Sequence, residues 1–82
     1  MNHLILYTKP DCHPCKAVKA DLKRNDIAYE EIDVSENPEA LERLIRNGIQ
    51  TAPAVAYAGK IGTIADLPGI KQLILTERKT NQ

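Results

Sequence analysis

The chain has 82 residues, the length of one small domain, and its formal net charge is zero. Hydrophobic residues make up 43% and charged residues 27%, a globular balance that gives no electrostatic argument for nucleic acid or a membrane surface. Phe and Trp are absent, so a base-stacking platform is not expected, and no apolar run approaches a transmembrane length. The start of the chain also lacks the basic segment and cleavage site of a signal peptide. We expect one cytoplasmic domain over residues 1–82, a monomer without nucleic-acid or membrane partners.

The first third of the chain predicts a strand, a loop and a helix. The apolar run His3–Thr8 is rich in strand-forming residues, and "KPDCHP" supplies loop and turn residues. From His13 to Asn25 the apolar residues recur with helical spacing. The residues of this apolar face are Cys15, Val18 and Leu22.

The middle of the chain predicts a second strand and a second helix. Residues Ile27–Val34 alternate imperfectly between apolar and polar, which favours a strand. In the next segment Asn37 can cap a helix that starts at Pro38 and ends before Gly48. Its expected apolar stripe is Leu41, Leu44 and Ile45.

The last third predicts a hairpin and a third helix. The strands are Ala54–Tyr57 and Lys60–Ile64, joined by a tight turn between them. Asp66 can cap a helix over about Leu67–Leu75, and the polar tail, about residues 76–82, is expected to fray. The order β-α-β-α-β-β-α predicts an α/β fold with a four-stranded mixed sheet and helices on both faces.

Both cysteines of the chain, Cys12 and Cys15, lie on the loop that leaves the first strand. Pro14 fits only in the first turn of the following helix, which places Cys12 at or just before the helix N-terminus. A C-x-x-C in a βαβ unit is typical of a redox dithiol, because the helix N-terminus favours the thiolate of the first cysteine. The second cysteine, one turn later, can attack the mixed disulfide that forms. We therefore expect Cys12 to be the exposed, attacking thiol and Cys15 the buried, resolving one.

Two other interpretations of the cysteine pair remain open. A zinc site needs four ligands, and only His3 and His13 could join the two cysteines. Because the sequence has neither a second C-x-x-C nor an H-x-x-x-H, no metal site is predicted. A purely structural disulfide would close a very small loop and stabilise the chain little.

The residues around the dithiol carry positive charge. Lys9 and Lys16 would favour a thiolate, as would His13 when protonated, although His13 could equally be an ordinary exposed residue at a helix start. Further along the chain, "QTAPAV" places Pro53 at the start of a strand, where sequence alone does not distinguish a cis from a trans bond.

The segments "YTKPDCHPCKAVKADL", "YEEIDVSENPEALERL" and "GIQTAPAV" resemble the glutaredoxin family, and within it the NrdH-type redoxins, over about residues 4–72. The resemblance implies a thioredoxin-like fold, a redox-active Cys12–Cys15 disulfide without a bound cofactor, and a cis Pro53 beside the dithiol. It also implies that the Ala52 backbone pairs with a bound substrate as an added strand.

Glutathione-binding positions of the family correspond to residues on three segments of this chain. They are Lys9, the segment Gln50, Thr51 and Ala52 before Pro53, and Asp66. The chain departs from the family between the cysteines, where it has His13 and Pro14, and at Thr63, which replaces a glycine.

We expect a dithiol–disulfide oxidoreductase that reduces protein disulfides. NrdH-type redoxins deliver electrons to ribonucleotide reductase, so the resemblance implies that partner, with thioredoxin reductase or glutathione as the electron source. The alternatives are a glutathione-dependent glutaredoxin and, more distantly, a non-enzymatic metal-binding or adaptor module on the same fold.

Overall fold

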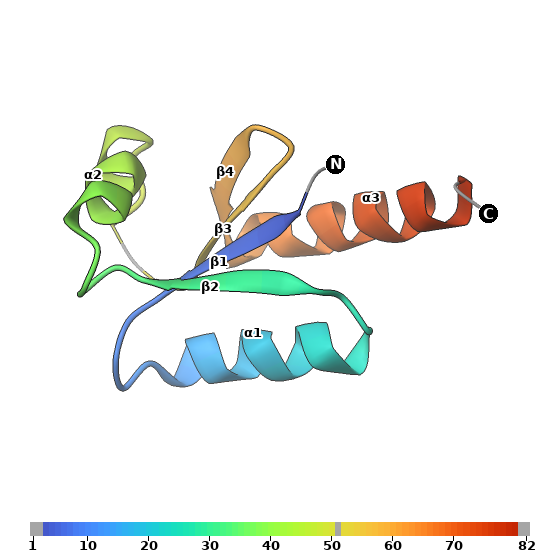
Figure 1. Ribbon diagram of the computed structural model, residues 1–82, viewed down its shortest axis with the longest axis horizontal. Helices are drawn as coiled ribbons and strands as arrows, with labels where there is room; N and C mark the ends of the chain where they lie inside the picture. The colour runs from blue at the N-terminus through green and yellow to red at the C-terminus, as the bar shows by residue number, and fades with distance from the viewer. Residues whose placement is uncertain (1–2, 51, 81–82) are drawn as a thin grey trace.

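The structure of the protein is a computed structural model that describes residues 3–50 and 52–80. Its elements follow the predicted order, with a short 3-10 helix (η1) added before the last helix (Figure 1). They are β1 (Leu4–Thr8), α1 (His13–Arg24), β2 (Tyr29–Asp33), α2 (Pro38–Arg46), β3 (Ala54–Tyr57), β4 (Lys60–Thr63), η1 (Ile64–Asp66) and α3 (Leu67–Thr80). Within the described residues no helix is long and apolar enough to cross a membrane.

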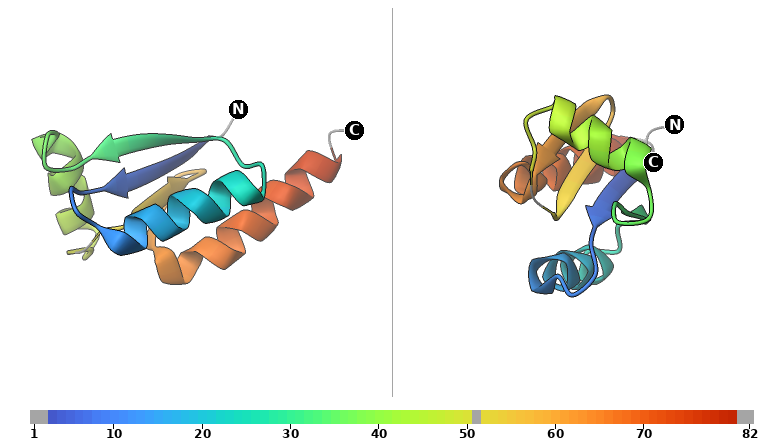
Figure 2. Two further views of the ribbon diagram at one scale, coloured as in Figure 1. Left: turned by 90° about the horizontal axis from the view of Figure 1, so that it is seen from below. Right: turned by 90° about the vertical axis from the view of Figure 1, so that its left-hand side faces the viewer.

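The four strands form one mixed sheet in the order β2-β1-β3-β4. β1 runs parallel to β2 and antiparallel to β3, and β3 pairs antiparallel with β4. Helices α1 and α3 cover one face of the sheet and α2 lies on the other (Figure 2). The predicted fold class is therefore confirmed.

Two apolar clusters hold the layers together. Under α1 and α3 the fully buried side chains include Leu6, Leu22 and Val55. On the α2 face Tyr7 and Leu44 are buried to a similar degree. Successive residues of a strand point to opposite faces, so Leu6 and Tyr7 reach different clusters from adjacent positions.

The predicted apolar stripe of α2 is wrong in two of its three positions. Ala40 and Leu44 face the core, whereas Leu41 is 42% exposed and Ile45 56% exposed. Helix α2 has only nine residues and crosses one end of the sheet (Figure 1), so a single row of its side chains meets the strands. Periodicity gave the correct helix but not the angle at which it meets the sheet.

The predicted end of the last helix near Leu75 is wrong, because α3 continues to Thr80, and residues 81–82 of the predicted frayed tail lie outside the described residues. Two contacts tie its last turns to the body of the protein. The Tyr57 hydroxyl donates a hydrogen bond to Glu77, and the Arg78 guanidinium donates to the Asp26 carbonyl at 3.0 Å. Both partners are distant in sequence, so the polar composition of the tail could not reveal them.

Candidate active site

The two cysteines form a disulfide at the start of α1. Cys12 is the N-cap residue, Cys15 lies in the first turn, and their Cα atoms are 5.2 Å apart. The Cys15 backbone N–H donates to Cys12 Sγ at 3.1 Å, so the sulfur takes the place of a capping oxygen. No acidic side chain lies in the first turn of α1. The helix N-terminus therefore directs partial positive charge at Cys12 Sγ.

Cys12 is less exposed than predicted. In the disulfide form Cys12 is 5% exposed and Cys15 2% exposed, so both sulfurs lie below the surface. The Cys12 side chain turns inward toward the segment before β3, and its Sγ lies 3.9 Å from the Ala52 carbonyl oxygen. The expected difference in exposure is not seen in the disulfide form, and for the two thiols of the reduced protein it stays a prediction.

The predicted cis bond is confirmed: the Ala52–Pro53 peptide is cis and Pro53 is buried. The short distance from Cys12 Sγ to Ala52 places this segment beside the dithiol. Gln50 is exposed in the connection between α2 and β3, and Thr51 lies outside the described residues.

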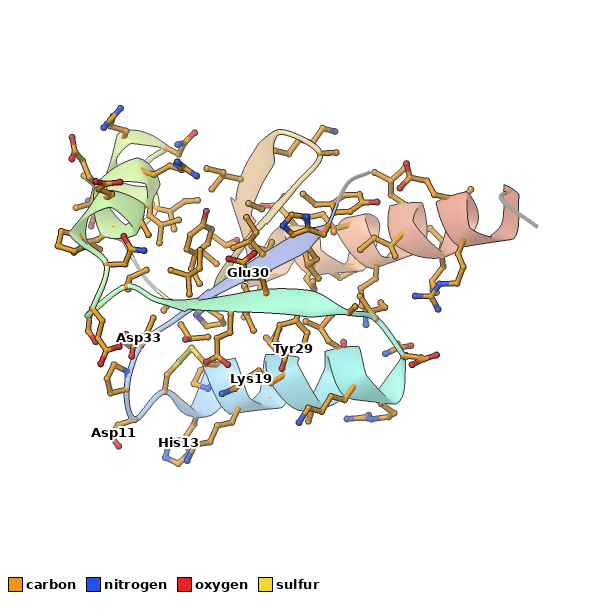
Figure 3. The ribbon with its side chains drawn as sticks, in the orientation of Figure 1. Asp11, His13, Lys19, Tyr29, Glu30 and Asp33 are labelled. Carbon is orange, nitrogen blue, oxygen red and sulfur yellow. A yellow bond between two sulfur atoms is a disulfide. The ribbon has the colours of Figure 1, made fainter. Side chains whose placement is uncertain are left out.

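Charged side chains surround the disulfide on the solvent side. A pocket of about 230 Å³ reaches both cysteines, and Lys9 and Lys16 are among the residues that line it. His13, exposed at the first position of α1, points away from the sheet (Figure 3), and Pro14 follows it, also exposed. This orientation favours the interpretation of His13 as an ordinary helix-start residue.

The same pocket contains a hydrogen-bonded network that the sequence analysis missed. Glu31 Oε2 accepts a hydrogen bond from Thr8 Oγ1 at 2.9 Å and contacts Lys19 Nζ at 3.2 Å. All three residues line the pocket at the disulfide. The sequence contains a signal for Thr8 alone, because Thr8 lies on the same strand face as Leu4 and Leu6, which are both buried.

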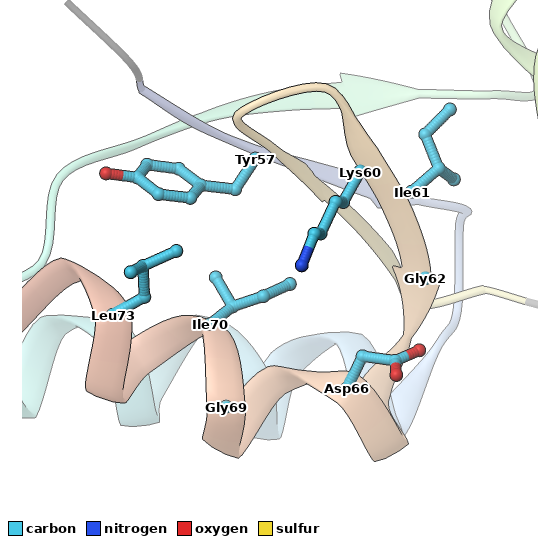
Figure 4. Close-up of a pocket in the computed structure, with 8 residues that line it drawn as sticks. All are labelled: Tyr57, Lys60, Ile61, Gly62, Asp66, Gly69, Ile70 and Leu73. Atoms are coloured by element: carbon cyan, nitrogen blue, oxygen red, sulfur yellow. The ribbon is translucent and has the colours of Figure 1, made fainter.

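Asp66 lies in a different part of the molecule. Its carboxylate accepts the Thr63 backbone N–H at 3.1 Å, and Thr63 Oγ1 accepts the Ala65 N–H at 3.2 Å, which makes a capping box around η1. Asp66 therefore caps the 3-10 helix rather than α3. It lines a separate pocket of about 610 Å³ between β4 and α3, over which the Lys60 side chain extends (Figure 4). Lys9 lines the pocket at the disulfide instead.

No group of three or more His, Cys, Asp or Glu side chains suited to a metal ion occurs in residues 3–50 and 52–80. The cysteine pair is engaged in its own disulfide.

Comparison with known proteins identifies the family. The glutaredoxin family model matches residues 4–61, which is more than half of the chain. The chain belongs to the glutaredoxin family. Among curated glutaredoxin-family relatives, the glutaredoxin-like protein NrdH of Lactococcus lactis subsp. lactis is 40% identical over 50 residues, covering 61% of this chain and 69% of that protein.

Solved structures of the glutaredoxin and thioredoxin type share this fold. The thioredoxin-like protein BC3987 is 37% identical with a TM-score of 0.72, covering 85% of this chain and 97% of that one. The glutaredoxin-like NrdH-redoxin from Escherichia coli, described with a thioredoxin-like activity profile, is 30% identical with a TM-score of 0.70, covering 74% and 80%. This glutaredoxin-family chain is a thiol–disulfide oxidoreductase with a thioredoxin-like fold.

Proposed function

We propose that the protein reduces protein disulfides, with Cys12 as the attacking thiol and Cys15 as the resolving thiol. The observation that carries this assignment is the 3.1 Å hydrogen bond from the Cys15 N–H to Cys12 Sγ at the N-terminus of α1. A sulfur in this position gains negative charge at low cost, because a backbone donor and the helix dipole both stabilise it. Cys15 has no comparable position, since it lies in the first turn behind the N-cap residue and its own N–H is the donor of this hydrogen bond.

The reaction proceeds in two exchanges. The Cys12 thiolate attacks one sulfur of the substrate disulfide, a mixed disulfide forms, and the first substrate thiolate leaves. The Cys15 thiolate then attacks Cys12 Sγ, which forms the Cys12–Cys15 disulfide and releases the second substrate thiolate. Two electrons pass to the substrate, and an external reductant must return the protein to its dithiol form.

We assign the physiological partner by similarity to the NrdH proteins. The 40% identity to an NrdH protein supports ribonucleotide reductase as the disulfide substrate and the cytoplasm as the location. The thioredoxin-like activity profile of the Escherichia coli NrdH-redoxin supports thioredoxin reductase as the electron source. The Asp66 carboxylate is engaged in the capping box of η1, so the glutathione-dependent alternative ranks second.

A comparison of two reducing systems tests the proposal. The oxidised protein is reduced in parallel with NADPH plus thioredoxin reductase and with glutathione plus its reductase, and insulin disulfides serve as the acceptor. We expect faster turnover with thioredoxin reductase and no turnover by Cys12→Ser in either system. Faster turnover with glutathione would show that glutathione, and not thioredoxin reductase, is the electron source. Activity of Cys12→Ser equal to that of the unchanged protein would overturn the mechanism.

A further inference from the structure

The Glu31 carboxylate lines the same pocket as the dithiol and makes two side-chain contacts there. Thr8, only 3% exposed, donates its hydroxyl hydrogen to Glu31 Oε2 from the end of β1. Lys19 contacts the same oxygen from α1, in the space between α1 and β2 where Figure 3 also shows the disulfide. Among residues 3–50 and 52–80 both contacts fall on Oε2, so Oε1 can accept a further hydrogen bond.

Cys15 needs a proton acceptor that the dithiol itself does not supply. The resolving step requires the Cys15 thiolate, and Cys15 is only 2% exposed in the disulfide form, so its sulfur has little direct contact with bulk water. Cys12 is unavailable as a base at this stage, because its sulfur is bonded to the substrate. The pocket of about 230 Å³ that both cysteines and Glu31 line offers a route for this proton.

We propose that Glu31 is the proton acceptor for Cys15 in the resolving step, acting through water in the pocket shared by Glu31 and the two cysteines. This inference rests on the roles proposed above for Cys12 and Cys15. It adds a role for a residue of β2 that lies far from the C-x-x-C motif in sequence. Thr8 and Lys19 are the positioning residues that hold the carboxylate.

The proton and the electrons balance in this step. The Cys15 S–H bond breaks and its proton passes to the Glu31 carboxylate. The thiolate attacks Cys12 Sγ, the Cys12–Cys15 bond forms, and the bond between Cys12 and the substrate sulfur breaks. The departing substrate thiolate, or solvent, takes the proton from Glu31, whose side chain is 39% exposed. No other reductant or oxidant is needed.

Other charged groups line the same pocket, and Glu31 differs from them in its contact with Lys19 of α1, the helix that carries Cys15. Lys9, Lys16 and Lys19 are cations, which favour a thiolate but do not accept a proton when charged. Asp11 and Asp33 are the other carboxylates of the pocket. Asp33 Oδ1 accepts hydrogen bonds from the Ser35 backbone N–H and hydroxyl at 2.9 and 2.6 Å, and Asp11 is exposed before α1 and points away from the sheet (Figure 3).

A chromogenic aromatic disulfide separates the two exchanges in time. Reduced protein mixed with this reagent releases one coloured thiolate when Cys12 attacks and a second when Cys15 resolves the mixed disulfide. We expect Glu31→Gln to slow the second release at neutral pH by roughly tenfold or more, the size typical of a lost general base, and to change the first release less than about twofold. The second release by Glu31→Gln should then rise with pH by about one decade per unit, because hydroxide replaces the carboxylate.

Glu30→Gln is the matched control, because Glu30 is the adjacent residue of β2 and pairs with His3 at 3.4 Å away from the pocket. Glu31→Asp keeps a carboxylate and should recover most of the rate of the second release. If Glu31→Gln does not fold, Glu31→Thr removes the carboxylate with a residue that favours strands. A second release by Glu31→Gln as fast as that of Glu30→Gln would overturn the role of Glu31. Loss of the first release in Glu31→Gln with its fold intact would also overturn it, whereas a normal first release by Cys12→Ser would overturn the proposed function instead.

Discussion

At the residue scale, Cys12 Sγ lies near one hydrogen-bond donor and one hydrogen-bond acceptor of the backbone. The Cys15 amide at 3.1 Å donates to it, and the Ala52 carbonyl oxygen lies 3.9 Å away. In the reduced protein a thiolate would be stabilised by the amide, whereas a protonated thiol could donate to the carbonyl. Both protonation states of the attacking residue thus find a partner in the same backbone arrangement.

Asp66 provides a test of whether the family's glutathione contacts apply to this chain. Because its carboxylate caps η1, Asp66→Ala should lower the free energy of unfolding by about 1 kcal/mol. Turnover with glutathione should change by less than about threefold. Chemical denaturation and a coupled glutathione assay measure the two effects.

Lys9→Ala is the companion variant, since Lys9 lines the pocket at the disulfide. A glutathione groove would be supported if Lys9→Ala and Asp66→Ala each slowed glutathione turnover by about tenfold, equivalent to about 1.4 kcal/mol. Stability and turnover with thioredoxin reductase would have to stay unchanged. The interpretation of Asp66 as a cap would then be incomplete.

At the element scale, the ion pair between α1 and α3 links the active-site helix to the C-terminal helix. Lys71 Nζ lies 2.6 Å from Asp21 Oδ2, and both side chains are partly exposed. The hydrogen bond from Lys71, opposed in part by burial, lowers the pKa of Asp21 below its usual value of 3.8. An acid with a lowered pKa stabilises the folded state above its unfolded pKa, and this contribution is lost as the pH falls through the folded pKa.

We therefore expect Lys71→Met to lower the free energy of unfolding at neutral pH by about 0.5–1 kcal/mol. The difference from the unchanged protein should shrink as the pH falls below about 4. Urea denaturation across this pH range measures it, and Glu42→Gln, which removes the exposed pair with Arg46, serves as the control. A Lys71→Met effect that grows as the pH falls would contradict the sign assigned to this pair.

The last turns of α3 depend on Tyr57 in β3. The Tyr57 side chain is buried, and its hydrogen bond to Glu77 is the main reason that the pKa of Tyr57 is raised above 10.0. Tyr57→Phe should lower the free energy of unfolding by about 1 kcal/mol and speed amide exchange at Glu77 and Arg78. Because a raised tyrosine pKa stabilises the fold below its unfolded value, the difference should fall away as the pH rises above about 10.

Tyr29→Phe offers a matched control, because Tyr29 packs against the same apolar cluster and no hydrogen bond involves its hydroxyl within residues 3–50 and 52–80. Equal exchange rates at the end of α3 in the two variants would show that Tyr57 does not hold this helix.

At the scale of the whole molecule, the sequence predicted those features that local patterns determine. Helix α1 could be placed because Cys15, Val18 and Leu22 recur at helical spacing, and all three are buried. The mixed sheet followed from the order of the strands. The angle of α2 and the docking of the last turns of α3 depend on contacts between segments distant in sequence, so periodicity alone could not give them.

The candidate active site was predictable to the same limited extent. The C-x-x-C motif located the dithiol, and the family resemblance located the cis Pro53. Glu31 was not predicted because it lies in β2, sixteen residues after Cys15. Only the parallel pairing of β1 with β2 brings it to the pocket at the disulfide. The separation of Asp66 from the pocket at the disulfide also required the folded arrangement of η1.

The measurement that tests the central claim most directly compares the two single-cysteine variants against a protein disulfide in excess. Each reduced variant is mixed with native insulin, whose disulfides are intact. Intact mass spectrometry follows the mixed disulfide over time. The account predicts that Cys15→Ser forms a stable adduct through Cys12. Cys12→Ser should form an adduct at least about tenfold more slowly, because the helix N-terminus does not stabilise a thiolate at Cys15. Adduct formation by Cys12→Ser as fast as by Cys15→Ser, with both variants folded, would contradict the assignment of Cys12 as the attacking thiol.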